Sequence, residues 1–159
     1  NQIMTNLIGE YECKVDAKGR LLIPSALRKQ FAPEAEGRLY VKRGIEQCLE
    51  IYQKHDWEAL SKKVSSLNQF VKKNRLFARK FISGAMQLEI DNIGRILLPK
   101  SMMEYANTDK DIVLFAYGNK IEVWNKEAYQ KALEMDEDEF ADLAEDVMGL
   151  INNGEDDLS

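Results

Sequence analysis

Hydrophobic and polar residues follow the same pattern twice along this chain. Alternating hydrophobic and polar residues lead into residues 16–20, DAKGR. An apolar run that ends at Pro24 follows this segment. Seventy-five residues later the same order returns at residues 91–95, DNIGR, with an apolar run closed by Pro99. Alternation with a period of two predicts strands, and proline predicts a break. Each copy is therefore expected to form a strand, a tight turn and a second strand.

The turn in each copy has a chemical basis. An aspartate at its first position accepts hydrogen bonds from backbone N–H groups, and a glycine at its fourth position takes the positive φ that closes it. The turn-forming residues are Asp16, Gly19, Asp91 and Gly94. Arg20 and Arg95 follow the glycines, so we expect the turn backbone to set the direction of both side chains.

Both copies continue in the same way after the proline. Each is predicted to add a short helix, two strands around a glycine, and a further helix that carries Trp57 or Tyr129. The predicted short helices are 25–31 and 100–106, and the predicted strands are 38–43, 48–52, 111–117 and 120–124. Agreement along the whole repeat indicates a duplicated unit.

Residues 61–83, between the two copies, are predicted to be helical. Apolar residues recur on two neighbouring faces, and seven basic residues lie off them, at positions 62, 63, 72, 73, 75, 79 and 80. One interpretation is a solvated basic face on a packing helix. The other adds attraction to phosphates.

An acidic tail occupies residues 134–159. Its apolar residues keep helical spacing, so we expect a helix that docks by an apolar edge, followed by disorder over residues 152–159. The formal net charge of the chain is −5. The eleven acidic residues after Lys131 contribute −11, so the rest of the chain carries +6. A basic body suits a polyanionic partner, although the sequence pI of about 5.1 hides it.

The predicted fold class is α+β. Two tandem β-β-α-β-β units, residues 9–60 and 84–133, are joined by the helical linker and followed by the acidic helical tail. Units of about 50 residues bury too little surface to be stable alone. We therefore expect them to share a core or to oligomerise.

Several kinds of chemistry find no support in the sequence. No apolar run approaches the roughly 20 residues of a membrane span, and the N-terminus has no signal-peptide pattern. Cys13 and Cys48 form neither a disulfide framework nor a zinc pattern, which fits a reducing cytoplasm. His55 is the only histidine, and no phosphate loop, catalytic triad or metal-spaced cluster occurs. Asp16 and Asp91 could be the two acids of a hydrolase, but turn formation explains them without catalysis. We expect no enzyme activity, cofactor, metal or small-molecule substrate.

The paired Asp-x-x-Gly-Arg turns, each followed by an apolar run and proline, resemble the AbrB-type swapped-hairpin DNA-binding domain. Two such units, with residues 74–81, NRLFARKF, leading into residues 83–85, SGA, resemble the MraZ family. The likeness covers residues 9–133. It implies a ring-shaped homo-oligomer that binds short direct repeats in double-stranded DNA upstream of the division and cell wall gene cluster. It also implies a repressor in the cytoplasm, at the nucleoid, whose Arg20 and Arg95 contact DNA.

The residues themselves support DNA contact. An exposed two-stranded ribbon fits a major groove, and arginine matches guanine O6 and N7. The candidate DNA-binding residues are Lys14, Lys18, Arg20, Arg28 and Lys29 in the first copy and Arg95 in the second. The other counterparts in the second copy are Glu89, Ile93, Met103 and Glu104. We therefore expect the first hairpin to dominate DNA affinity and the second to serve in assembly.

Two alternatives stay open. Each arginine could simply form an ion pair with the aspartate of its own turn, which is compatible with DNA contact because a paired arginine is already oriented. The chain could also be an antitoxin-like or scaffold module that binds protein without specific DNA binding. The acidic tail favours that second alternative, because it would repel DNA unless it is docked. Salt dependence separates the two classes, since phosphate contacts weaken steeply with salt.

Overall fold

The computed structural model describes residues 5–33 and 37–153. The chain divides into two compact units, of which the first ends at Tyr129 and the second begins at Gln130. The expected disorder over 152–159 is not supported at its start, because residues 152 and 153 continue the last helix. Residues 154–159 lie outside the described part of the chain.

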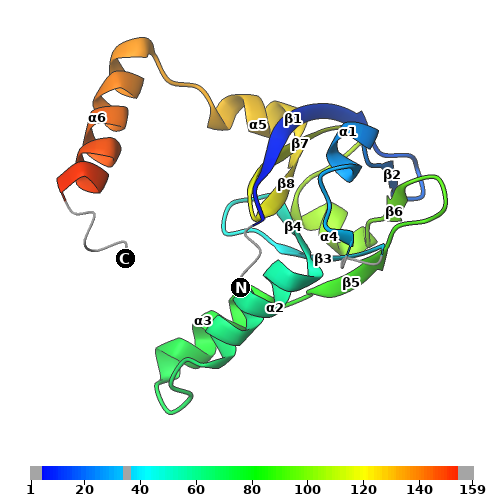
Figure 1. Cartoon of the computed structure of the whole chain (residues 1–159), viewed down its shortest axis with the longest axis horizontal. Coiled ribbons are helices and arrows are strands. Elements are labelled where there is room, and N and C mark those ends of the chain that lie inside the picture. The colour runs from blue at the N-terminus through cyan, green and yellow to red at the C-terminus, as the bar shows by residue number, and fades with distance from the viewer. Residues whose placement is uncertain (1–4, 34–36, 154–159) are drawn as a thin grey trace. The chain divides into compact units, whose positions relative to one another are not determined.

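The order of elements, strand–strand–helix–strand–strand–helix–helix, occurs twice (Figure 1). The first repeat comprises β1 (Leu7–Lys14), β2 (Arg20–Leu22), α1 (Ser25–Arg28), β3 (Arg38–Arg43), β4 (Leu49–Gln53), α2 (Lys54–Ser65) and α3 (Lys72–Ile82). The second repeat comprises β5 (Met86–Glu89), β6 (Arg95–Leu97), α4 (Lys100–Tyr105), β7 (Asp111–Gly118), β8 (Lys120–Asn125), α5 (Lys126–Ala132) and α6 (Glu137–Asn153). The predicted strands and short helices therefore form, with ends that differ by at most three residues.

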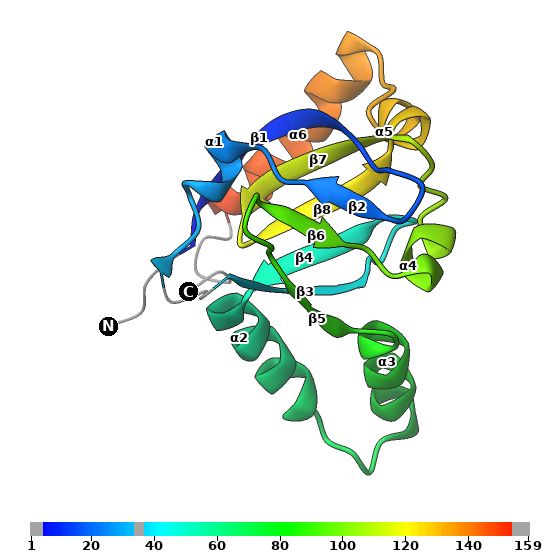
Figure 2. The same cartoon turned by 90° about the vertical axis from the view of Figure 1, so that its right-hand side faces the viewer.

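The two repeats exchange strands. A six-stranded antiparallel sheet has the order β1-β7-β8-β4-β3-β5, so the first strand of each repeat pairs with the third strand of the other. The remaining two strands, β2 and β6, pair with each other in a separate ribbon, which Figure 2 shows in front of the large sheet.

One hydrophobic core lies between the ribbon and the sheet. It takes Leu21 and Leu39 from the first repeat and Ile96 and Leu114 from the second, and all four side chains are at most 1% exposed. Each such burial stabilises the fold by roughly 1.5–3 kcal/mol. The repeats thus share a core, as their small size predicted.

The other face of the sheet carries a smaller cluster with a buried ion pair. Lys42 is fully buried, and its Nζ lies 3.3 Å from Glu50 Oε1, which also accepts a hydrogen bond from the Tyr52 hydroxyl at 2.8 Å. Tyr129 packs in this cluster as a buried aromatic. The Trp57 ring stacks on Tyr40 with centroids 5.8 Å apart. Both predicted aromatic positions therefore serve in packing.

Residues 61–83 were predicted to be helical, and helix forms in two parts of this range but not in the segment between them. Helix α2 ends at Ser65 and α3 begins at Lys72. Between them the Asn68 side chain accepts a hydrogen bond from the backbone N–H of Phe70 at 3.0 Å, which is the local bonding by which asparagine competes with helix. Phe70 is consequently 96% exposed instead of packing on a helical stripe.

Helix α6 forms where the tail was predicted to be helical. Its apolar residues are exposed in the described structure: Phe140, Leu143, Val147, Met148, Leu150 and Ile151. Docking of this apolar edge remains a prediction.

Candidate nucleic-acid interface

The first turn connects β1 to β2 through hydrogen bonds to one aspartate. Asp16 Oδ1 accepts from the backbone N–H groups of Lys18 and Arg20, both at 2.9 Å. The backbone N–H of Gly19 donates to the Asp16 carbonyl at 3.0 Å, with a φ of +91° at the glycine. This geometry is the one that the Asp-x-x-Gly pattern predicted.

The second turn repeats the first bond by bond. Asp91 Oδ1 accepts from the backbone N–H groups of Ile93 at 3.0 Å and Arg95 at 2.8 Å. The backbone N–H of Gly94 donates to the Asp91 carbonyl at 3.0 Å, and its φ is +95°. Both turns are therefore built by the same local chemistry.

Each turn arginine is held by its own aspartate. Arg20 Nε donates to Asp16 Oδ2 at 2.7 Å, and Arg95 Nε donates to Asp91 Oδ2 at 2.8 Å. The arginine side chains remain 41% and 36% exposed. The ion pairs considered above thus exist, and they orient guanidinium groups that solvent still reaches.

The aspartates are stabilised in their charged form. The backbone N–H of Arg20 is the main cause that lowers the pKa of Asp16, and the backbone N–H of Arg95 does the same for Asp91. Both carboxylates are therefore ionised at neutral pH and can hold their arginines.

The ribbon that carries these arginines differs from the expected one. We expected the two strands beside each turn to pair as a hairpin, but the described contact between them is short. It consists of the Val15–Leu21 bridge at the first turn and one backbone hydrogen bond across the base of each turn, from Asp16 N–H to the Arg20 carbonyl and from Asp91 N–H to the Arg95 carbonyl. The ribbon instead takes β2 from one repeat and β6 from the other. The hairpin expectation was wrong because alternation predicts a strand without predicting its partner.

Side chains along each strand of the ribbon point alternately to its two faces, and the outer face carries two arginines. Leu21 pairs with Ile96 at the centre, and both point into the core. Arg20 pairs with Leu97 on one side, and Leu22 pairs with Arg95 on the other. Leu22 and Leu97 are 52% and 57% exposed, so they share the outer face with the arginines. The outer-face position of these leucines was not predicted from the sequence. It could have been, because each leucine directly follows a core residue, Leu21 or Ile96, and adjacent side chains of a strand point to opposite faces.

Each turn is also bound to the other repeat. The backbone N–H of Ile23 donates to the Gly94 carbonyl at 2.9 Å, and that of Leu98 donates to the Gly19 carbonyl at 2.9 Å. Each strand that follows one turn therefore runs on to meet the other turn.

This crossing places Arg28 beside the second turn. Arg28 Nε donates to the Ile23 carbonyl at 2.9 Å. Its guanidinium lies so close to Gly94 that a Cβ at this residue would be 2.5 Å from Arg28 Cζ. Met103, the counterpart of Arg28, lies against Gly19. A Cβ at Gly19 would be 3.2 Å from the Met103 sulfur. Arg28 was expected around the first hairpin and the helix that follows it. It lies on that helix, α1, and it also contacts the second turn because the repeats exchange strands.

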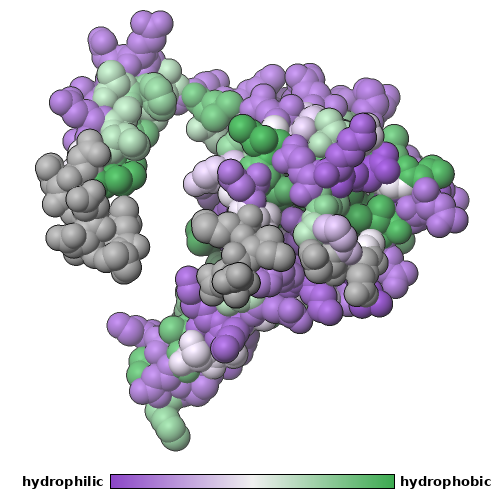
Figure 3. Space-filling model, viewed as in Figure 1, coloured by the Kyte–Doolittle hydropathy of each residue, from purple (hydrophilic) through white to green (hydrophobic). Residues whose placement is uncertain are grey.

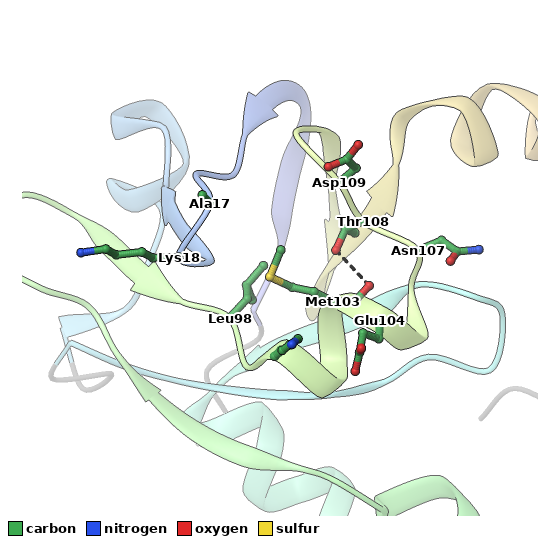
Figure 4. A pocket seen from close by; sticks show the side chains of 9 residues that line it. Ala17, Lys18, Leu98, Met103, Glu104, Asn107, Thr108 and Asp109 are labelled. Atoms are coloured by element: carbon green, nitrogen blue, oxygen red, sulfur yellow. Dashed lines mark hydrogen bonds between the residues drawn. The ribbon is translucent and has the colours of Figure 1, made fainter.

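The first turn has mixed charges around it. A depression of about 600 Å³ lies between this turn and α4, and its charged lining residues are Lys18, Lys100, Glu104 and Asp109. In Figure 4 the Lys18 side chain points away from Glu104 and Asp109. Lys18 is therefore the cation that this turn presents outward beside its arginine.

The other two basic candidates lie elsewhere. Lys14 ends β1 and its Nζ forms an ion pair with Asp111 Oδ1 at 3.0 Å. Lys29 is exposed just after α1. Of the six basic candidates, the structure thus places Arg20 and Lys18 at the first turn and Arg95 and Arg28 at the second.

The described residues hold no group of three or more His, Cys, Asp or Glu side chains placed to bind a metal ion. Among them no helix is long and apolar enough to cross a membrane. His55 is exposed near the start of α2.

Fold and site together define a duplicated α+β protein whose repeats exchange strands and display paired arginine turns. A family model described as "MraZ protein", antitoxin-like, matches residues 7–80 and again residues 81–150. This chain belongs to the MraZ family. The second match passes Leu133, where we expected the likeness to end, and includes most of α6.

Three relatives bear the name "Transcriptional regulator MraZ". The protein of Christiangramia forsetii is 50% identical over 92% of this chain and 95% of its own. That of Flavobacterium psychrophilum is 45% identical over 96% and 98%, and that of Cytophaga hutchinsonii is 40% identical over 86% and 91%. A solution structure of PHS018 from Pyrococcus horikoshii covers 74% of this chain and 87% of that one at 16% identity, with a TM-score of 0.30 that supports no argument.

Proposed function

We propose that this protein is a sequence-specific DNA-binding transcriptional regulator that acts as a repressor. The observation that carries the proposal is the outer face of the β2–β6 ribbon. There Arg20 and Arg95 come from two turns with the same hydrogen bonding, are oriented by ion pairs and stay exposed. The names of the relatives agree with this function.

Physical chemistry favours double-stranded DNA as the ligand of this face. A two-stranded ribbon has dimensions that suit the major groove, and arginine can donate two hydrogen bonds to guanine O6 and N7. Lys18 and Arg28 lie beside the two turns, where they can meet phosphates. The basic charge outside the tail adds attraction at a distance.

The finer parts of the proposal follow from the family resemblance and the repeats. The exchanged strands fit the AbrB-type swapped-hairpin arrangement. We propose a ring-shaped homo-oligomer that acts on direct repeats upstream of the division and cell wall gene cluster, at the nucleoid in the cytoplasm. Subunits related by head-to-tail contacts present their binding faces in one direction, which suits direct rather than inverted repeats.

A binding titration tests the proposal. A duplex carrying spaced direct repeats is compared with a scrambled duplex, using the wild-type protein, Arg20→Ala, Arg95→Ala and the control Lys131→Ala. Loss of a bidentate arginine should weaken specific binding by about 1–3 kcal/mol, with Lys131→Ala near wild type. Equal affinity of the wild type for both duplexes would contradict sequence-specific recognition.

A second candidate function is protein binding without specific DNA recognition. The acidic helix α6, with its exposed apolar residues, is the observation that favours it. Affinity for DNA that is weak and insensitive to salt would favour this function, because several phosphate contacts impose a steep salt dependence.

A further inference from the structure

An apolar groove beside α3 takes no part in the proposed DNA interface. It has a volume of about 270 Å³, and it is lined mainly by Arg43, Ile45, Phe77, Lys80, Phe81 and Tyr105. Ile45 is 79% exposed and Phe77 is 48% exposed. Exposed apolar side chains gathered in a concave site are typical of a docking surface.

The groove is held in shape by several contacts. The Phe81 ring lies under Lys42 Nζ, 3.8 Å from the ring centroid, and stacks on Phe77 with centroids 5.0 Å apart. The Tyr105 hydroxyl donates to the Gly44 carbonyl at 2.9 Å. A preformed site of this kind loses little conformational entropy when it is filled.

Charge identifies the occupant. Helix α3 carries five lysines and arginines and no acidic residue: Lys72, Lys73, Arg75, Arg79 and Lys80. Helix α6 carries six acidic residues and no basic one: Glu137, Asp138, Glu139, Asp142, Glu145 and Asp146. Opposite charges on two surfaces steer them together and reject a partner of like charge.

Helix α6 also has the apolar edge that the groove requires. Phe140, Leu143 and Val147 follow one face of the helix and are 62%, 45% and 49% exposed. Figure 3 shows apolar side chains along α6 in green, bordered by hydrophilic ones in purple. The helix has 17 residues, and its length of roughly 25 Å is enough to span the groove and its basic margin.

We propose that α6 of one copy of this chain docks in the α3 groove of a second copy. The Phe140 and Leu143 side chains fill the apolar floor, and carboxylates at the edges of the apolar face, such as Glu139, meet Lys80 and Arg43. This inference deepens the proposed homo-oligomer and rests on it.

The contact is directional. Each copy offers one groove and one helix, and the two surfaces differ from each other, so association is head to tail. Contacts of this kind close into a ring when the rotation between copies permits it. The groove and α6 would thus supply the ring contact, while the β2–β6 ribbon remains available for DNA.

The test measures mass by light scattering without DNA. A groove variant, Ile45→Glu with Lys80→Glu, is compared with a helix variant, Phe140→Lys with Glu139→Lys. The matched control is Ile8→Glu, because Ile8 is 74% exposed on β1, at the opposite edge of the sheet from β5. We expect each of the two variants to lose the oligomer and the control to keep it.

Mixing the two variants gives the decisive result. The helix variant keeps a native groove and the groove variant keeps a native α6, so the mixture should form a complex of two chains and grow no further. Wild-type mass in either variant, or no complex in the mixture, overturns the proposal. Docking of α6 on its own chain would leave the wild type at the mass of one chain, which would also overturn the proposal. DNA affinity measured on the same samples is a separate readout, so failure of this contact and failure of DNA binding can be told apart.

Discussion

Arg20 and Arg95 combine a structural contact with a proposed binding role. Each guanidinium donates through Nε to the aspartate four residues earlier, and each side chain remains more than one third exposed. An exposed ion pair of this kind contributes little stability. Its value for recognition is that it restricts the arginine to one orientation before DNA arrives.

The turn aspartates predict a pH dependence of stability. Because folding lowers the pKa of Asp16 and of Asp91, their contribution is fully present above the unfolded value near 3.8 and is lost as the pH falls through the lower folded value. Urea unfolding of the wild type and of Asp16→Asn with Asp91→Asn, measured from pH 7 to pH 3, should show a difference at neutral pH that shrinks below about pH 4. A difference that stays constant over this range would show that the charge has no role.

The turn glycines predict unequal effects of alanine. Both have positive φ, so alanine is strained at either position. At Gly19 the new Cβ would lie 2.7 Å from the backbone oxygen of Leu98, whereas at Gly94 it meets the flexible end of Arg28. Gly19→Ala should destabilise the fold by about 1–3 kcal/mol and by more than Gly94→Ala. Chemical denaturation measures both, with Gly149→Ala as the control because nothing lies within 4 Å of its Cβ position. An equal or larger loss for Gly94→Ala would contradict this packing.

At the scale of elements, the turns were predictable from the sequence and the strand partners were not. The Asp-x-x-Gly pattern determines the turn through bonds among neighbouring residues, so Asp16 and Gly19 could be assigned directly. The pairing of β2 with β6 depends on which apolar faces share the core. Nothing local to Leu21 distinguishes Ile96 as its partner. The position of Arg28 follows from that pairing and was missed for the same reason.

The Arg28 side chain of α1 reaches the turn of the other repeat, which predicts energetic coupling. Arg28 lies against Gly94, the residue before Arg95. In a double-mutant cycle on DNA affinity, Arg28→Ala should couple to Arg95→Ala by about 0.5–3 kcal/mol and be nearly additive with Arg20→Ala. Coupling to Arg20 instead of Arg95 would contradict this placement of Arg28.

At the scale of the whole molecule, the shared core makes the two repeats interdependent. Each repeat gives its first strand to a strand of the other, and both repeats line the one large core. The sequence predicted a shared core from the small size of the units. It could not predict the break between α2 and α3, where the Asn68 turn overrides the apolar spacing.

Separated repeats should therefore fail to fold as monomers. Fragments 1–83 and 84–159 should each lack a cooperative thermal transition at low concentration, and an equimolar mixture should regain one, as circular dichroism can measure. A cooperative transition in either fragment as a monomer would contradict the shared core.

The most direct measurement of the central claim uses a duplex with direct repeats in which 7-deazaguanine replaces guanine. This base lacks N7, one of the two acceptors that arginine uses in the major groove. The account predicts that the wild type binds the substituted duplex more weakly than the normal one, and that the double variant Arg20→Ala with Arg95→Ala binds both equally. A wild type that does not distinguish the duplexes, or a double variant that distinguishes them as the wild type does, would contradict recognition of guanine by these two arginines.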